Sequence, residues 1–97
     1  MRNRPEYDMK IVGQNLKRLR ESNGLTVEEV REYLRLGSVQ AIYKHESGRA
    51  YPQADTLLAL MELYGVGVSE IVGKYEEGVM PSSVVYIEEY GRNTKVG

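Results

Sequence analysis

Two helix-boundary signals lie next to each other at residues 23–29, and this pairing limits the fold more than any other feature of the chain. Asn23-Gly24 supplies residues that tolerate positive φ, as the C-terminal end of a helix requires. Thr26 and Glu29 have the spacing of a capping box, in which each side chain bonds the other residue's backbone amide. An apolar stripe follows, formed by Val27, Val30 and Leu34. The sequence therefore predicts two helices joined by a tight connection.

Helical periodicity predicts further helices on both sides of this pair. From about Lys10 onward, one narrow sector of a helix contains Val12, Leu16, Leu19 and Asn23. A helix over residues 55–64, ended by Gly65, has an apolar face made of Ala54, Leu57, Leu60, Met61 and Tyr64. Ser69 is predicted to cap a short fifth helix that reaches about Val72. These segments predict an all-α fold.

The segment between them predicts a third helix over residues 38–46. Leu36-Gly37-Ser38 has the composition of a turn, Ser38 is placed to cap the helix, and Gly48 follows its end. At helical spacing, one arc of this helix carries Val39, Gln40, Tyr43 and Lys44. The opposite arc carries Ala41, Ile42, His45 and Glu46. We expect the second arc to face the core and the first to face solvent.

The outward arc has the chemistry of a DNA-reading surface. Glutamine can bond adenine N6 and N7 together, lysine donates to guanine acceptors or to phosphate, and valine can pack on a thymine methyl group. Gln40, Lys44 and Val39 thus each have a role in direct readout. The alternative is that this arc is only the solvated face that every amphipathic helix has.

The composition fits a single globular domain. The chain has 97 residues, of which 41% are apolar and 28% charged, and it contains no cysteine for disulfides or thiolate metal sites. No stretch approaches the roughly 18 apolar residues of a membrane helix. The N-terminus lacks the apolar run of a signal peptide, so we expect a cytoplasmic protein without a membrane partner.

We divide the chain into a flexible arm at 1–9, a domain at 10–73 and an acidic tail at 74–97. Residues 84–87 within this segment are β-prone. They either pair as a strand, within a dimer or along the body of the domain, or are simply part of a mobile acidic tail. The net charge of −1 combines a basic half, +3 over residues 1–52, with an acidic half, −4 over residues 53–97. A basic N-terminal half fits a protein with one DNA-facing side.

Residues 12–72 resemble the Cro and phage-repressor type of helix-turn-helix family, also called Xre-like. The resemblance rests on Leu16, Leu19, Arg20, Leu25-Thr26, Glu28-Glu29-Val30, Ser38 through Ile42, Glu46, Gly48, Pro52, Leu57, Leu60 and Gly65-Val66. It implies a five-helix, lambda-repressor-like domain whose second and third helices form the DNA-binding unit. The third helix is then expected in the major groove.

The resemblance also implies roles for individual residues. Base contacts fall to Val39, Gln40 and Lys44, with Tyr43 beside them, and a phosphate contact to Arg49 in the following loop. Tyr51 contacts the DNA backbone or only decorates that loop. Thr26 and Ser38 join the DNA-binding set because helix N-termini attract phosphate. Arg20 and Glu46 fall where relatives often form an internal ion pair, which we interpret as structural.

Four departures from the family pattern affect this interpretation. The connection between residues 34 and 38 is one residue longer than the commonest form, and Arg31 replaces a small residue that permits close helix crossing. The angle between the second and third helices is therefore left open. Val27 replaces a phosphate-binding glutamine, and His45 replaces a larger apolar residue.

Catalysis and metal binding are not expected. His45, the only histidine, lies on the inward arc as a packed core residue rather than a pH switch, and no second histidine or cysteine could complete a transition-metal site.

We predict no enzyme and no cofactor, but a homodimeric repressor on a palindromic operator with half-sites about 34 Å apart. A restriction-modification controller, an antitoxin, or a protein-interaction module that has lost DNA binding are the alternatives.

Overall fold

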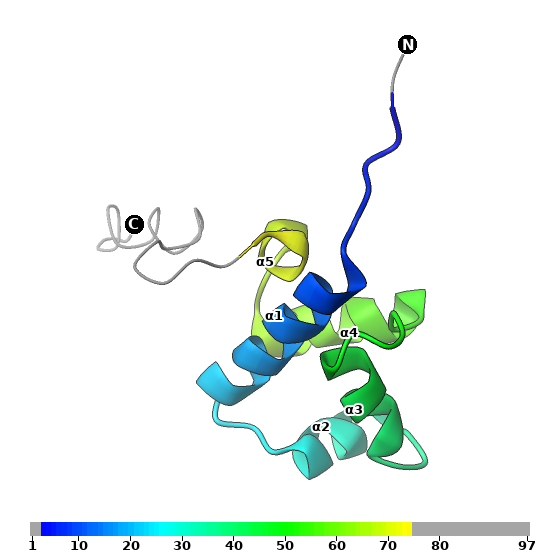
Figure 1. Cartoon of the computed structure of the whole chain (residues 1–97). Helices are drawn as coiled ribbons and strands as arrows, with labels where there is room; N and C mark the ends of the chain where they lie inside the picture. The colour runs from blue at the N-terminus through cyan, green and yellow to red at the C-terminus, as the bar shows by residue number, and fades with distance from the viewer. Residues whose placement is uncertain (1–2, 75–97) are drawn as a thin grey trace, which may run out of the picture.

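The computed structural model describes residues 3–74, and this part of the chain forms five α-helices without a strand (Figure 1). The helices are α1 (Met9–Ser22), α2 (Val27–Leu34), α3 (Gln40–Glu46), α4 (Ala54–Tyr64) and α5 (Val68–Val72). The predicted all-α, five-helix fold is confirmed. The expected strand at 84–87 and the tail beyond residue 74 lie outside the described residues.

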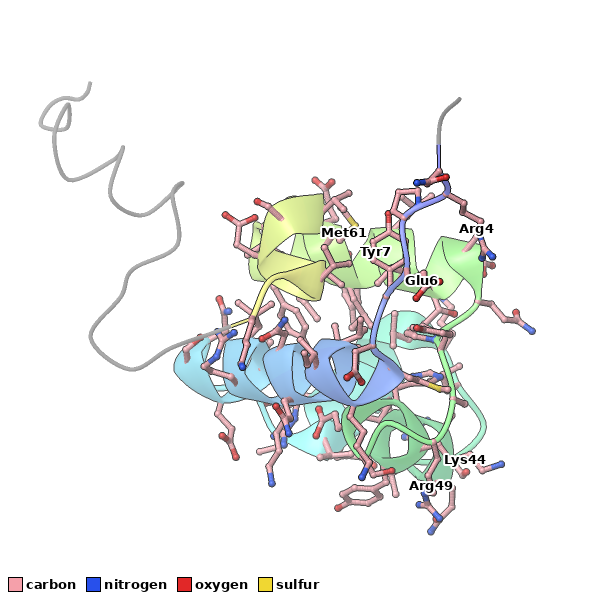
Figure 2. All side chains as sticks on the ribbon, turned by 45° about the horizontal axis from the view of Figure 1, so that its top comes forward. Arg4, Glu6, Tyr7, Lys44, Arg49 and Met61 are labelled. Carbon is pink, nitrogen blue, oxygen red and sulfur yellow. The ribbon has the colours of Figure 1, made fainter. Side chains whose placement is uncertain are left out.

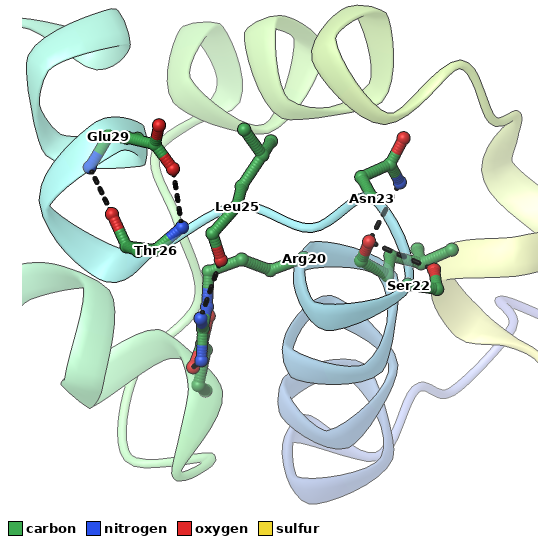
Figure 3. Close-up of polar contacts among 8 residues, drawn as sticks. Arg20, Ser22, Asn23, Leu25, Thr26 and Glu29 are labelled. Carbon is green, nitrogen blue, oxygen red and sulfur yellow. Dashed lines mark hydrogen bonds and ion pairs between the residues drawn. The ribbon is translucent and has the colours of Figure 1, made fainter.

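The two boundary signals at residues 23–29 are confirmed (Figure 3). Asn23 is the C-cap of α1, and Gly24 follows with a φ of +69°. The Thr26 hydroxyl accepts a hydrogen bond from the Glu29 amide at 3.1 Å, and the Thr26 amide donates to Glu29 Oε1 at 2.8 Å. These bonds satisfy two of the backbone amides that the first turn of α2 would otherwise leave without partners.

Two predicted helix caps are wrong by one or two residues. Val39, not Ser38, is the N-cap of α3, because the Val39 carbonyl accepts the first helical bonds, from the amides of Ile42 and Tyr43. The Ser38 hydroxyl still accepts the Gln40 amide at 3.3 Å, the kind of bond that a capping serine makes. Likewise Gly67, not Ser69, is the N-cap of α5. There the Glu70 carboxylate accepts from the Gly67 amide at 3.0 Å, which starts the helix earlier and places Ser69 inside it.

Helix α1 lies in the middle of the bundle, with α5 on one side and the α2–α3 pair on the other (Figure 1). Helix α2 also contacts α4. The buried apolar side chains come from all five helices: Val12, Leu16, Leu19, Val30, Ile42, Leu60, Tyr64 and Ile71. The sectors predicted from periodicity supply most of this core, but Asn23 and Ala54, which were predicted to lie in them, are exposed.

A close approach between α1 and the end of α3 depends on a glycine that sequence analysis overlooked. A β-carbon on Gly13 would lie 2.5 Å from the His45 carbonyl oxygen and 2.7 Å from that of Glu46. Carbon atoms do not approach backbone oxygens so closely, so this position requires glycine despite its cost of about 1 kcal/mol inside a helix. The C-terminal end of α3 is therefore seated directly on α1.

A buried asparagine joins α1 to α5, and it too was missed from the sequence. Asn15 is 2% exposed, and its side-chain amide donates to the carbonyl oxygens of Ile71 and Gly73, both at 2.7 Å. These carbonyls belong to the last turn of α5 and the residue that follows it, where no helical amide is available to bond them. Asn15 thus completes the C-terminal end of a helix distant in sequence.

Candidate nucleic-acid interface

The outward arc of α3 is exposed as its helical spacing predicts. Gln40, Tyr43 and Lys44 are exposed and Val39 is partly exposed, whereas Ile42 on the opposite side is 3% exposed. Tyr43 leaves almost half of its surface, 47%, in contact with solvent. An amide, a phenol and an ammonium group are therefore presented together on a seven-residue helix whose other face is anchored in the core.

The loop after α3 holds Arg49 beside Lys44. The Arg49 amide donates to the Lys44 carbonyl at 3.0 Å, and Arg49 Nε donates to the Ser47 hydroxyl at 3.0 Å. Ser47 in turn donates to the Lys44 carbonyl at 3.2 Å. Figure 2 shows the Lys44 and Arg49 side chains projecting on the same side of the molecule. Two cations are thus close to the exposed face of α3.

The hydroxyl groups of three other predicted site residues already have partners within the chain. The Tyr51 hydroxyl donates to the Tyr7 carbonyl at 3.0 Å, so it ties the loop to the N-terminal segment. Thr26 is occupied by its capping box, and the Ser38 hydroxyl accepts from the Gln40 amide at 3.3 Å. Exposed as these residues are, their contacts with DNA stay predictions.

The predicted ion pair between Arg20 and Glu46 is present and nearly buried. Arg20 Nε and Nη2 donate to the two Glu46 carboxylate oxygens at 2.7 and 3.1 Å, and the side chains are 11% and 7% exposed. Arg20 Nη1 also donates to the Leu25 carbonyl at 2.9 Å (Figure 3). The bond to Glu46 raises the pKa of Arg20 above its usual value. One guanidinium therefore joins α1, the α1–α2 connection and the end of α3.

His45 is half-buried at the same end of α3. Burial lowers its pKa below the ordinary value, and the neighbouring Glu46 carboxylate opposes this shift only in part. The neutral imidazole is therefore favoured, although His45 is not fully buried in the core as the sequence predicted. Within residues 3–74 the structure contains no group of three or more acidic, histidine or cysteine side chains that could hold a metal ion.

The chain turns between α2 and α3 earlier than the predicted Leu36-Gly37-Ser38 turn. Arg35, not Gly37, adopts the left-handed conformation, with a φ of 59° and a ψ of 39°. Arg31, one of the departures from the family pattern, donates from Nη1 to the Leu36 carbonyl at 2.9 Å. No local sequence pattern indicates this bond, because it depends on the path of the backbone.

None of the helices in the described part of the chain combines the length and apolar character that crossing a membrane demands.

Comparison with known proteins gives two positive findings. A family model described as a helix-turn-helix domain matches residues 11–71. No curated protein matches the chain significantly.

The second finding is likeness to solved structures of regulators. The clp gene regulator ClgR from C. glutamicum is 21% identical, with a TM-score of 0.59 over 72% of this chain and 88% of that one. The restriction-modification controller C.AhdI from Aeromonas hydrophila is 23% identical, with a TM-score of 0.59 over 66% and 96%. The DNA-binding domain of BldD is 26% identical, with a TM-score of 0.57 over 67% and 93%.

Proposed function

The chain belongs to the family of helix-turn-helix domains, and from this premise we propose that it is a small transcriptional regulator that binds double-stranded DNA at specific sequences. In this proposal α3 enters the major groove, because a recognition helix reads base edges there. The fold supports the regulator class, since it is shared with ClgR, C.AhdI and the DNA-binding domain of BldD.

The observation that carries the proposal is the exposed face of α3 with two cations beside it. Gln40 presents an amide that can bond adenine at two atoms, and Lys44 presents a donor for guanine or phosphate. Val39 lies at the start of this face, where its methyl groups can pack on thymine. We assign sequence discrimination to these three residues, with Tyr43 beside them.

Affinity comes from contacts with the phosphate backbone in this proposal. Lys44 lies on the exposed face of α3 and Arg49 lies beside it, so both can neutralise DNA phosphates. The amides at the starts of α2 and α3, next to Thr26 and Ser38, are the uncharged candidates. Tyr51 is 48% exposed, and its hydroxyl can donate to phosphate only by leaving the Tyr7 carbonyl.

We further propose that the protein acts as a homodimer and represses by occupying a palindromic operator in the cytoplasm. The support is an exposed apolar patch on α4, where Leu58 is 64% exposed. Leu58 lines a shallow hollow of about 420 Å³ together with Met61, Glu62, Gly65 and Val66. Apolar surface of this kind is typical of an interface between subunits.

The test begins with selection of bound duplexes from a random pool. We expect a palindrome with half-sites about 34 Å apart, one turn of the DNA helix. Affinity for the selected site is then measured against salt for the wild type, Gln40→Ala, Arg49→Ala and, as a control for lost charge, Lys74→Ala. Lys74 follows α5, on the side of α1 away from α3.

Gln40→Ala should cost roughly 1–3 kcal/mol on the selected site and little on random DNA. Arg49→Ala should weaken both duplexes and lower the salt slope by about 1, as loss of one phosphate contact does. Lys74→Ala should match the wild type. A salt-independent affinity, or no duplex recovered from the pool, would instead favour a protein-interaction module.

A further inference from the structure

The α2–α3 connection begins with a helix end that is unusual in its residue type. Arg35 occupies the left-handed position that glycine normally takes, and the Arg35 amide donates to the Glu32 carbonyl at 3.2 Å. The next amide, of Leu36, donates to the Arg31 carbonyl at 3.1 Å. These two bonds make a Schellman motif, which fixes the direction in which the chain leaves the helix.

The side chain of Arg31 adds a second bond to the same residue. Arg31 Nη1 donates to the Leu36 carbonyl at 2.9 Å, so Leu36 is bonded to Arg31 through both its amide and its carbonyl. Nε and Nη2 of the same guanidinium donate to Glu28 Oε2, at 3.0 and 2.7 Å. The planar guanidinium is therefore held from two sides, by α2 and by the connection.

This arrangement continues to the first residue of α3. Ser38 lies two residues after Leu36, and its hydroxyl accepts the Gln40 amide at 3.3 Å. The other end of α3 is fixed independently, by Glu46 bonded to Arg20 and by the close approach of Gly13. Because α3 is only seven residues long, a change in the path at Leu36 moves Gln40 while the far end stays in place.

We propose that Arg31 is a positioning residue for sequence recognition, which holds Leu36 and thereby sets the place of Gln40 relative to the DNA bases. The inference rests on the proposed function and extends it to a residue outside the exposed face of α3. Arg31 is suited to this role, because three of its five N–H donors are used within the chain and the Glu28 carboxylate already pairs with its charge. Its side chain is 25% exposed.

The experiment compares Arg31→Ala, Arg31→Lys and Glu28→Gln with the wild type and with Lys74→Ala. Lysine keeps the positive charge but has a single nitrogen, which cannot span Glu28 and Leu36 as the guanidinium does. Affinity is measured on the site selected by the wild-type protein and on random duplex, each against salt. Amide hydrogen exchange at Leu36 and Gln40 is measured without DNA, with Ile42 as the core reference.

We expect Arg31→Ala and Arg31→Lys to lose roughly 10-fold in affinity on the selected site, about the effect of one displaced base contact, and less than 2-fold on random duplex. The salt slope should stay unchanged. Exchange at Leu36 and Gln40 should accelerate while Ile42 stays protected, which shows that the domain remains folded. Glu28→Gln should have a smaller effect in the same direction, and Lys74→Ala none.

Two results would overturn the assignment while leaving the proposed function intact. If Arg31→Lys binds like the wild type while Arg31→Ala weakens both duplexes and lowers the salt slope, Arg31 is a phosphate contact. If all variants discriminate like the wild type, the connection does not position α3. If the wild type itself fails to discriminate between duplexes, the proposed function fails. Accelerated exchange at Gln40 would then show only that Arg31 stabilises the start of α3.

Discussion

The two ends of α3 are held by different means. At the C-terminal end, the Arg20–Glu46 ion pair is nearly buried and Gly13 lets the backbone of α1 touch that of α3. At the N-terminal end, Gln40 is exposed and the bonds that guide the chain, from Arg31 and from Ser38, lie at or near the surface. Bonds at an exposed end compete with water, so they contribute less to stability.

If α3 reads DNA as we propose, this contrast separates the residues that stabilise the domain from those that recognise DNA. Substitutions at the buried end should change the free energy of unfolding by several kcal/mol, whereas substitutions at the exposed end should change it little and alter DNA binding instead. The following predictions test this division, from the largest expected effect to the smallest.

Glu46→Ala should lower the free energy of unfolding by about 3–5 kcal/mol, because it leaves the Arg20 guanidinium nearly buried without its carboxylate. Urea unfolding followed by circular dichroism measures the loss, and Glu6→Ala, an exposed acid that lies before α1, is the matched control. The double variant Arg20→Met with Glu46→Leu should recover much of the stability. A loss no greater than that of the control would show that water reaches the pair freely.

Gly13→Ala should lower the free energy of unfolding by about 2 kcal/mol, since the new β-carbon meets the His45 and Glu46 carbonyls. This loss outweighs the gain of about 1 kcal/mol that alanine brings within a helix. Gly37→Ala, where a β-carbon meets nothing within 4 Å, is the control and should change stability little. Thermal unfolding of both variants measures the change. A Gly13→Ala variant more stable than the wild type would contradict the close packing of α1 on α3.

Arg35→Gly, near the exposed end, should raise the free energy of unfolding by about 0.5 kcal/mol. Glycine removes the left-handed strain of about 1–2 kcal/mol but adds about 0.4–1 kcal/mol of entropy to the unfolded chain. Urea unfolding gives the difference, and the same substitution at Arg4, which lies before the first helix, serves as the control. A clear loss of stability would mean that the arginine side chain contributes more than its backbone strain costs.

His45 should give the smallest effect, a decrease in stability at mildly acidic pH. Because burial lowers the pKa of His45 in the folded state, its contribution is fully present above the unfolded value of 6.5. That contribution is lost as the pH falls from there through the lowered pKa, where the unfolded chain binds the proton more readily. Urea unfolding at a series of pH values should show this decrease for the wild type and not for His45→Leu. Equal pH dependence in both proteins would assign the effect to carboxylates.

Much of the fold could be predicted because its signals are local. The capping box of Thr26 and Glu29 needs only residues three apart, and the apolar sector of α1 follows from the helical repeat alone. The exposed and buried faces of α3 followed from spacing in the same way. The Arg20–Glu46 pair came from the family resemblance, since nothing in its separation along the chain indicates contact.

The residues that were missed act across the sequence. Asn15 bonds carbonyls near residues 71–73, and Gly13 makes room for carbonyls of α3, so their roles depend on how helices are brought together. The caps assigned to Ser38 and Ser69 were wrong because hydroxyl preference is only one of several ways to satisfy a helix N-terminus. The roles of individual side chains in DNA binding stay predictions.

The amino-acid sequence by itself determined where helices form and which of their faces are apolar, because propensity, capping and periodicity act within a few residues of the chain. Only the tertiary structure decided how α3 is held. Its buried end depends on Gly13 and Arg20 meeting it from α1, and its exposed end depends on a left-handed residue at Arg35 and the return of Arg31 to Leu36. Such contacts arise from packing and backbone path, which local sequence patterns do not encode.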